Sequence, residues 1–389
     1  EALDKVSVLQ ASDKQFLFLP LAHSFAKVME IAFIRLGVPT VVDGDPDALL
    51  ENLQATQPTV FGGVPRIFEK VYDAVQAGAK EAGGAKYRLF RWAMDVGNAV
   101  SALRQKGQEP RGSLAIQHKL ADKLVYSKLK EKFGGQIRYF ISGGAPLAPE
   151  IASFFHAADI LVLEGYGMTE SSAASVVNGP DAFKFGTVGK PLPGMEIRIA
   201  DDGEILMKGR GVMRGYYNRE KATREALVDG WLHTGDIGVV DEEGYLKITD
   251  RKKDIIVTAG GKNIAPQNIE NKLKVKSSLI SQAVMHGDKR PYCVALVALN
   301  EENAQQWAKD RGLGLSEGSS LAELKEIHAR VWSDVQSVND TLASYETIKK
   351  IHILPTELSQ ESGELTPTLK VKRRVVEKRF KKILDSLYE

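Results

Sequence analysis

Short apolar runs alternate with longer amphipathic stretches at the start of the chain. The runs at Phe16–Leu19, Thr40–Val42 and Thr59–Phe61 are separated by sequences with helical periodicity. Alternation of strands with helices is typical of an α/β fold with a mostly parallel sheet. We therefore expect residues 1–185 to form the α/β layers of a large domain, present in part.

A long helical pattern interrupts this alternation from about residue 69 to residue 133. The segment is rich in Ala, Lys and Arg and has a glycine break at Gly83–Gly84. The alternation then resumes, with strands expected at Ile137–Ile141 and Ile160–Leu163 and a helix between them from about Ala148 to Ala157.

The texture of the sequence changes again after Gly186. Short alternating strands are expected at Met195–Ile199, Glu204–Met207, Gly238–Val240 and Tyr245–Ile248. Acidic residues followed by glycine separate them, at Asp201–Gly203 and Asp241–Gly244. Such turns predict an antiparallel sheet or small barrel for residues 186–250.

A run of charge, Asp250–Asp254, marks the domain boundary that we predict. Residues 251–389 are expected to form a smaller α+β domain with a final helix from Val371 to Leu387. The apolar stripe of that helix is expected to comprise Val375, Val376, Phe380, Ile383, Leu384 and Leu387. Most of its later Lys and Arg residues are expected to face solvent.

Composition narrows the classes of protein. The chain has 389 residues, of which 43% are hydrophobic and 26% charged, as in globular proteins of the aqueous phase. A formal net charge of +2 argues against a nucleic-acid partner. The single cysteine, Cys293, lies in an expected strand and is interpreted as a small core residue in a reducing, cytoplasmic setting. No apolar run reaches the roughly 20 residues that span a bilayer.

The first candidate site is Gly165–Glu170, which follows the expected strand at Ile160–Leu163. Tyr166 can offer a ring face to a base, and Thr169 can donate a hydrogen bond to a phosphate. Glu170 is a candidate magnesium ligand, because Mg²⁺ is commonly held by one or two carboxylates together with substrate phosphates. An ordinary glycine turn is the alternative interpretation.

The loop Ser142–Leu147 also follows an expected strand, where open α/β sheets bind ligands. Gly143, Gly144 and Ala145 would let the backbone approach a flat base closely. A plain turn between strand and helix is the alternative here.

Two further candidates lie beyond residue 230. Asp236, in Trp231–Ile237, is a candidate for holding a ribose diol, because a carboxylate accepts two hydrogen bonds. Arg251 is a second candidate, since its fork of donors can hold a sugar or a phosphate. The alternatives are a turn aspartate before a strand and a solvated surface arginine.

Lys370 is the candidate cation near the end of the chain. It lies in a loop that begins at Gly363 and precedes the expected final helix. A point charge on a flexible stem can neutralise a phosphate during displacement.

Taken in order, these motifs resemble the adenylate-forming superfamily of acyl-CoA synthetases, luciferases and peptide-synthetase adenylation domains. The set comprises Pro20–His23, Ser142–Leu147, Gly165–Glu170, Gly203–Glu204, Trp231–Asp236, Asp250–Lys253, Gly260–Asn263 and Lys370, and it covers essentially the whole chain. Val257–Pro266 and the Thr-Leu-Lys sequence at Lys370 are most similar to the long-chain fatty acid–CoA ligase branch. Many relatives carry Gly in place of Leu369, and residues 69–133 resemble a helical insertion typical of long-chain members.

The resemblance implies two half-reactions with ATP, Mg²⁺ and coenzyme A. A fatty carboxylate attacks the α-phosphorus of ATP and forms acyl-adenylate and pyrophosphate; the thiol of coenzyme A then displaces AMP. Tyr166 and Gly167 would contact adenine, Thr169 the α-phosphate, and Glu170 the magnesium. Asp236 and Arg251 would hold the ribose.

The remaining roles are also implied by the resemblance. Lys370 would assist adenylation, and His23 and Gly165 would shape the acyl site. Gly261 would lie beside the pantetheine of coenzyme A. Lys253, in the stretch 250–254, would be the hinge about which the C-terminal domain turns. Peripheral contact with a membrane is plausible for an enzyme of lipid substrates.

One family feature has no equivalent in this sequence. The Ser/Thr/Gly-rich phosphate loop of the family would lie upstream of Glu1. We therefore expect the chain to be a fragment of a longer protein and to be impaired as a catalyst by itself. The alternatives are a ligase that passes the acyl group to a carrier protein, and a non-catalytic acyl- or nucleotide-binding remnant.

Overall fold

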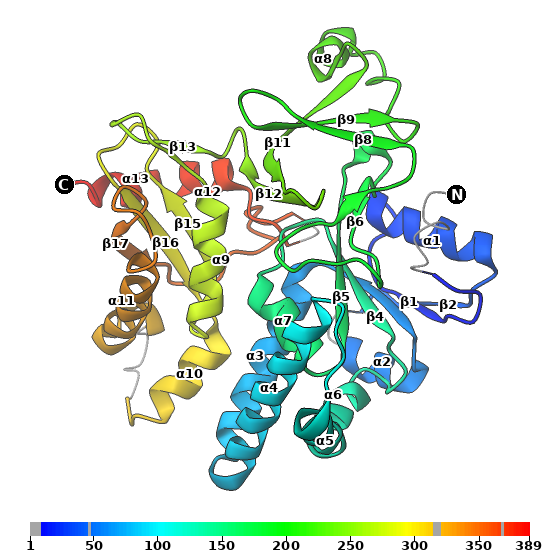
Figure 1. Ribbon diagram of the computed structural model, residues 1–389. Helices are drawn as coiled ribbons and strands as arrows, with labels where there is room; N and C mark the ends of the chain where they lie inside the picture. Colours follow the sequence, from blue (N-terminus) through cyan, green and yellow to red (C-terminus); the bar gives the residue numbers. More distant parts are fainter. Residues whose placement is uncertain (1–8, 46–47, 314–319, 367–368) are drawn as a thin grey trace. The chain divides into compact units, whose positions relative to one another are not determined.

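Residues 9–45, 48–313, 320–366 and 369–389 are described in the computed structural model of the protein (Figure 1). They fall into two units. The N-terminal unit comprises the chain up to Thr234 together with Gly238–Ile248, and the C-terminal unit comprises Gly235–Ile237 together with Thr249–Glu389. Each unit has its own core.

A seven-stranded sheet organises the N-terminal unit, in the order β2-β1-β3-β4-β5-β6-β7. Its strands are β1 (Gln15–Leu17), β2 (Thr40–Val42), β3 (Val60–Gly63), β4 (Tyr139–Gly143), β5 (Leu161–Tyr166), β6 (Val176–Val177) and β7 (Lys190–Pro191). The first five strands pair in parallel, and β6 and β7 are antiparallel. The mostly parallel sheet predicted from the sequence is thus confirmed.

Helices cover both faces of this sheet, as a parallel sheet requires. They are α1 (Ser24–Leu36), α2 (Leu49–Thr56), α3 (Pro65–Ala82), α4 (Gly84–Arg104), α5 (Gly112–Ala121), α6 (Ser127–Glu131) and α7 (Pro149–Ala157), with a π-helical turn η2 (Asp122–Tyr126) between α5 and α6. Met29 and Phe33 of α1 pack on one face with Tyr139 and Leu163. On the other face the rings of Phe140 and Phe155 meet edge to face, with centroids 5.8 Å apart.

A second, antiparallel sheet follows, as the sequence predicts. Its strands are β8 (Met195–Ile199), β9 (Glu204–Gly209), β10 (Leu227–Val228), β11 (Trp231–Val240) and β12 (Leu246–Arg251), with α8 (Glu220–Ala226) before β10. β8 pairs antiparallel with β9, and β10 with β11. β11 and β12 contribute residues to both units.

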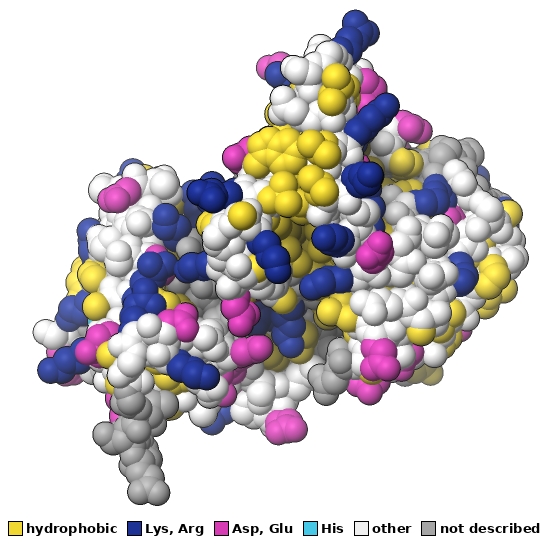
Figure 2. Space-filling view, turned by 90° about the horizontal axis from the view of Figure 1, so that it is seen from below, with side chains coloured by type: hydrophobic (Ala, Val, Ile, Leu, Met, Phe, Trp, Pro, Cys, Tyr) yellow, Lys and Arg dark blue, Asp and Glu magenta, His cyan; other side chains and the backbone are white. Residues whose placement is uncertain are grey.

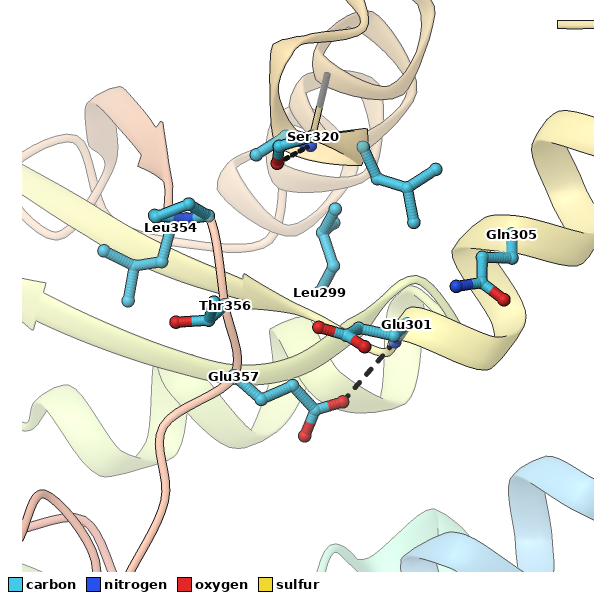
Figure 3. A pocket seen from close by; sticks show the side chains of 10 residues that line it. Leu299, Glu301, Gln305, Ser320, Leu354, Thr356 and Glu357 are labelled. Atoms are coloured by element: carbon cyan, nitrogen blue, oxygen red, sulfur yellow. Dashed lines mark hydrogen bonds between the residues drawn. The ribbon is translucent and has the colours of Figure 1, made fainter. Parts of the chain in front are cut away.

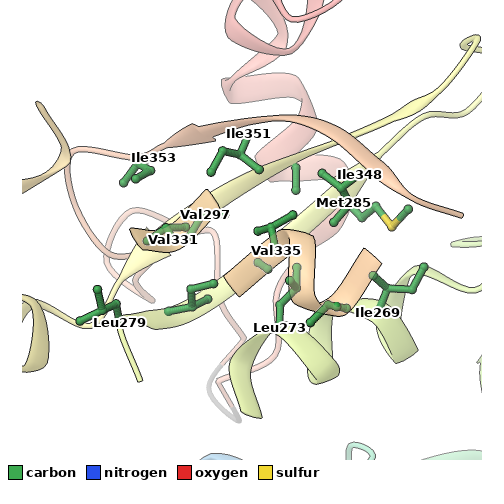
Figure 4. Packing of buried hydrophobic residues seen from close by; sticks show 14 of the residues in the cluster. Ile269, Leu273, Leu279, Met285, Val297, Val331, Val335, Ile348, Ile351 and Ile353 are labelled. Atoms are coloured by element: carbon green, nitrogen blue, oxygen red, sulfur yellow. The ribbon is translucent and has the colours of Figure 1, made fainter. Parts of the chain in front are cut away.

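The C-terminal unit is built on the sheet β15-β16-β17. Its elements are β13 (Ile256–Val257), β14 (Asn263–Ile264), α9 (Pro266–Lys276), β15 (Ile280–His286), β16 (Cys293–Leu299), α10 (Glu301–Lys309), η4 (Leu321–Glu323), α11 (Lys325–Asn339), β17 (Ile348–Ile353), α12 (Arg373–Arg379) and α13 (Lys381–Ser386). Alternate residues of β16 point to opposite faces. Ala295 and Val297 join the cluster beneath α9 and α11 (Figure 4), whereas Val294 and Leu296 pack with residues of α12 and α13.

Several local predictions can be compared with this unit. Cys293 is fully buried in β16, so the interpretation as a core residue is confirmed, and burial raises the pKa of its thiol to about 11. The prediction of a single final helix is wrong, because Phe380 leaves helical geometry (φ −99°, ψ 20°) and separates α12 from α13. Val375 is 40% exposed and does not belong to the apolar stripe.

Arg373 is an exception among the basic residues of this segment, because it does not face solvent. Its guanidinium donates to both carboxylate oxygens of Glu270, at 2.7 and 2.9 Å, and to the carbonyl of Met285. Both side chains are largely buried, so this ion pair ties α12 to α9.

Positive and negative side chains intermix over the face drawn in Figure 2, in keeping with the net charge of +2. Among the described residues, no helix combines the length and the apolar character needed to cross a membrane.

The contact between α4 and α7 gives a direct test of this packing. A Cβ atom added at Gly97 would lie 2.1 Å from the carbonyl oxygen of Ala157, whereas one at Gly78 of α3 would meet no atom within 4 Å. We expect Gly97→Ala to lower the free energy of unfolding by about 1–3 kcal/mol through overpacking.

The matched control is Gly78→Ala, which should raise the free energy of unfolding by about 0.5–1 kcal/mol, since alanine is the better helix former. Urea denaturation of both variants measures the difference. Equal stability of the two variants would contradict the close approach of α4 to α7.

Candidate functional site

Two glycine-containing loops leave the same edge of the parallel sheet. β4 and β5 are paired in parallel with Gly143 opposite Gly165, so the loops that follow them begin side by side. This edge is where open α/β sheets bind ligands. The structure therefore brings together the first two candidate sites.

The loop after β4 lies over an aromatic ring. A Cβ atom at Gly143 would come within 3.3 Å of the ring of Phe25 in α1, and Gly144 has a φ of +86°, which favours glycine. Ala145 is half-buried. The backbone N–H of Leu147 donates to Glu164 Oε2 at 3.2 Å and fixes the far end of the loop.

The loop after β5 is packed more tightly than the sequence suggests. A Cβ at Gly167 would lie 1.3 Å from the carbonyl oxygen of Ala173, so glycine is required there by the chain itself. Gly165 is less constrained, because its Cβ would lie 3.4 Å from Val177. Tyr166 is only 8% exposed and packs beside Val176, so its contact with a base stays a prediction.

Thr169 and Glu170 begin the 3₁₀ turn η3 (Thr169–Ser171). Thr169 is exposed and Glu170 is half-buried. The hydroxyl of Tyr216 donates to Glu170 Oε1 at 2.9 Å, and the backbone N–H of Met213 donates to the carbonyl of Glu170 at 2.7 Å. Burial, followed by the neighbouring Glu170 carboxylate, raises the pKa of Tyr216. The sequence carried no signal for Tyr216, which lies 46 positions away.

Glu164 is a second residue that sequence reasoning missed. Its side chain is 5% exposed in β5, opposite Ser142 of β4. In the described part of the chain, Glu164 Oε1 and Ser142 Oγ are buried without a hydrogen-bond partner. Burial raises the pKa of Glu164 to about 8, against the opposing effect of the Leu147 N–H. Burial therefore favours the protonated, neutral form of Glu164 beneath the loop.

A second group of candidates lies in the C-terminal unit. Arg251 Nε lies 3.2 Å from Oδ1 of Asp236, which is 6% exposed. Burial first, and then Arg251, lowers the pKa of Lys370 to about 8, while Asp236 acts in the opposite direction. These three candidates, far apart in the sequence, are electrostatically coupled.

Their surroundings bear on the two alternatives. Asp236 lies within the ten-residue strand β11, so it is not a turn aspartate before a strand. Arg251 ends β12 and pairs with Asp236, but its side chain is 44% exposed, so it is also a surface arginine.

Lys370 is held by the turn that precedes it. Its N–H donates to Thr366 Oγ1 at 3.0 Å, and the N–H of Thr366 donates to the carbonyl of Lys370 at 2.8 Å. Leu369 has a φ of +59°, a left-handed conformation that costs a non-glycine residue roughly 1–2 kcal/mol. Its side chain packs against the core cluster of Leu365 and Val376, which offsets this cost. Pro367 and Thr368 of this loop lie outside the described residues.

The other predicted residues have simple surroundings. His23 caps α1, its Nδ1 accepting from the N–H of Phe25 at 3.3 Å. Gly261 has a φ of +73° and open space where a Cβ would be. Lys253 is exposed. Their acyl, coenzyme A and hinge roles stay predictions.

A hollow of about 200 Å³ lies elsewhere in the C-terminal unit (Figure 3). It is bordered by Leu299, Leu354 and the pair Glu301 and Glu357, whose contact runs from the Glu301 N–H to Glu357 Oε1 at 3.4 Å. None of the predicted site residues lines it. Over the described ranges, no three His, Cys, Asp or Glu side chains form a group that could hold a metal ion.

The arrangement of glycine loops at the edge of a parallel sheet, followed by an α+β unit, is the fold of adenylate-forming enzymes. The adenylation domain of a carboxylate reductase from Mycobacterium chelonae superimposes with a TM-score of 0.74 at 22% identity, over 97% of this chain and 54% of that one. O-succinylbenzoate coenzyme A synthetase from Bacillus subtilis, in complex with ATP and magnesium, gives 0.61 at 22% identity, over 96% and 62%.

The chain belongs to the AMP-binding enzyme family. Residues 2–217 match that family, and residues 253–389 match its C-terminal domain. The long-chain-fatty-acid–CoA ligase FadD15 of Mycobacterium bovis is 41% identical over 98% of this chain and 63% of its own length. Long-chain-fatty-acid–CoA ligase 1 of Cavia porcellus is 34% identical over 100% and 56%. The chain thus spans roughly three fifths of these relatives.

The buried acid at Glu164 yields a prediction about stability. The folded chain keeps this proton up to about pH 8, whereas the unfolded chain releases it near its ordinary pKa of 4.5. The unfolded state then binds fewer protons, so the free energy of unfolding should fall as pH rises between these values.

Glu164→Gln removes the titrating group and keeps a similar shape. Chemical denaturation from pH 5 to pH 8 should therefore show a smaller fall in the free energy of unfolding with pH for the variant than for the parent chain. Parallel pH dependences would mean that Glu164 is ionised in the folded protein.

Proposed function

We propose that the protein acts as a long-chain fatty acid–CoA ligase. Membership of the AMP-binding enzyme family supports adenylation, and the relatives named as long-chain-fatty-acid–CoA ligases support the substrate. The observation that carries the mechanism is the group of Asp236, Arg251 and Lys370, in which a partly buried lysine feels the charges of a carboxylate and a second cation.

The reaction has two steps. An oxygen of the fatty carboxylate attacks the α-phosphorus of ATP, and the bond to pyrophosphate breaks. The thiol of coenzyme A then attacks the acyl carbon, loses its proton to solvent and releases AMP with that carboxylate oxygen. The ATP, the fatty acid and coenzyme A are substrates, and each step balances without a further reactant.

The chain's own residues would serve these steps in two ways. Asp236 can accept from ribose hydroxyls, because a carboxylate accepts several hydrogen bonds. Lys370, when protonated, can stabilise the negative charge that develops on the phosphate oxygens. Both roles concern orientation and charge, which dominate phosphoryl and adenylyl chemistry.

Glu170 fits the magnesium ion that the family implies, because it offers a carboxylate. Glu170 is a half-exposed carboxylate held in place by Tyr216, and Mg²⁺ usually takes one or two carboxylates together with substrate oxygens. When bound, the ion would supply charge neutralisation for the phosphates. Thr169, next to it, would donate to the α-phosphate.

Further roles rest on the resemblance. We assign Gly143, Gly144, Ala145, Tyr166 and Gly167 to the adenine side, Gly165 and His23 to the acyl group, and Gly261 to coenzyme A. Lys253, within the stretch 250–254, is proposed as the hinge between domains 1–250 and 251–389. Transfer to a carrier protein is the alternative, and no observation favours it. The setting proposed is cytoplasmic, with peripheral contact to membranes.

Pyrophosphate exchange with fatty acids of increasing chain length tests the function. It should be carried out on this chain and, where its gene encodes a longer protein, on that protein. We expect ATP–pyrophosphate exchange that depends on a long fatty acid. Exchange with no dependence on any fatty acid in the longest form of the protein would contradict the proposal.

The two half-reactions should depend differently on Lys370. We expect Lys370→Ala to slow acyl-adenylate formation by roughly 10²–10³-fold, the usual cost of removing one charge-stabilising donor. Thioester formation from supplied acyl-adenylate should change little. Single-turnover assays of each step separate the effects, and an equal slowing of both would exclude this division of roles.

The pKa of Lys370 predicts a pH dependence. Because the ammonium group of Lys370 loses its proton near pH 8, kcat/KM for ATP in adenylation should fall as pH rises through this value. Lys370→Arg keeps its charge to much higher pH. Its profile should lack the decline, even if its overall rate is lower. A decline retained in Lys370→Arg would assign the pKa to another group.

A further inference from the structure

The helical segment that the proposed reaction does not use ends in one continuous helix. α5, η2 and α6 follow one another from Gly112 to Glu131, and the residues at both junctions keep right-handed helical geometry. Figure 1 shows this helix beside α4, and the contacts agree.

The inner face of this helix is fully engaged within the N-terminal unit. Ala121, Tyr126 and Leu129 are buried, and the Tyr126 hydroxyl donates to the carbonyl of Ala93 in α4. Asp159 forms ion pairs with Arg104 at 2.6 Å and Lys130 at 3.4 Å, and His118 Nε2 lies 3.1 Å from its Oδ1. The helix is therefore anchored in the N-terminal unit through its inner face.

The outer face carries three exposed aliphatic side chains, which its anchoring does not explain. Ile116, Leu120 and Leu124 are 71%, 48% and 36% exposed and recur at every fourth position. In an α-helix, positions four apart drift by about 40° around the axis. Leu124 lies in the π-helical turn, which holds more residues per turn than an α-helix. Each residue there rotates less around the axis, and this compensates for the drift. The three side chains thus form one stripe along the helix.

Basic residues border the stripe. Lys119, Lys123 and Lys128 are exposed on the same helix. Six basic and two acidic residues lie from 111 to 132, a formal charge of +4, whereas the whole chain carries +2. Lysines beside an aliphatic stripe can extend their stems along an apolar layer and place their ammonium groups among anionic headgroups.

We propose that this stripe, Ile116, Leu120 and Leu124 with its bordering lysines, docks the protein on the surface of an anionic phospholipid bilayer. The bilayer is a partner for the proposed function. The proposal rests on that function, because a long fatty acid, the proposed substrate, resides in membranes. The concentrated positive charge favours a lipid surface over a second copy of the chain, whose own stripe would carry the same charge. The side chains would enter the interface without spanning it.

The test is flotation with vesicles of phosphatidylcholine containing 30% phosphatidylglycerol, compared with pure phosphatidylcholine, in about 0.1 M salt. We expect binding to the anionic vesicles. Replacing Lys119, Lys123 and Lys128 by Gln should weaken it on the order of 100-fold, because each lysine near such a surface contributes about a five-fold factor. Replacing Ile116, Leu120 and Leu124 by Gln should weaken it by at least about ten-fold.

A matched control uses another exposed aliphatic pair. Ile31 and Ile34 on α1 are 57% and 71% exposed, and the Lys27–Glu30 ion pair lies beside them. Ile31→Gln with Ile34→Gln should leave vesicle binding unchanged. Thermal melts verify that each variant is folded, since all the changed side chains are exposed.

The outcomes separate this inference from the ligase proposal. Loss of binding in the stripe variant, with unchanged adenylation of a short soluble fatty acid, supports docking through the stripe. Equal binding by the stripe variant, or no binding by the parent chain, overturns it. So does a parent chain that is dimeric in light scattering and becomes monomeric in the stripe variant. Vesicle binding together with no ligase activity in the longest form of the protein would leave the docking surface standing and remove the proposed function.

Discussion

Parallel pairing of β3, β4 and β5 is the constraint from which the N-terminal unit follows. Parallel strands need crossover connections, and their two faces must both be covered. α1 covers one face and the aromatic cluster of α3 and α7 the other. With both faces occupied, the carboxyl edge is where a ligand can reach the sheet, and there the chain changes from large apolar side chains to glycines.

The same constraint explains the least expected group in this unit. Glu164 is the residue of β5 that directly precedes Gly165 at the glycine edge, and its side chain is buried within the unit. A carboxyl group in that position keeps its proton and accepts from the backbone of the neighbouring loop. It joins two loops that the proposed chemistry uses, at the cost of a buried oxygen without a partner in the described part of the chain.

The sequence predicted regular, locally encoded features well. The strands at Thr40–Val42 and Met195–Ile199 have the predicted bounds, because alternation and turn residues specify them locally. Non-local contacts were missed. Asp236 lies inside a strand because of its pairing partners, and Tyr216 reaches Glu170 across 46 positions. Arg373 lies among basic residues that face solvent, yet its side chain is buried and donates to Glu270, which lies on a helix 103 residues earlier.

The central claim is that a fatty carboxylate is activated by adenylation in a protein that carries this chain. Supplying a fatty acid labelled with ¹⁸O in its carboxylate, together with ATP, Mg²⁺ and coenzyme A, tests it most directly. Because the attacking oxygen leaves with AMP, mass spectrometry should find one ¹⁸O atom in each AMP formed with acyl-CoA. Label in inorganic phosphate, accompanied by ADP, would contradict the account.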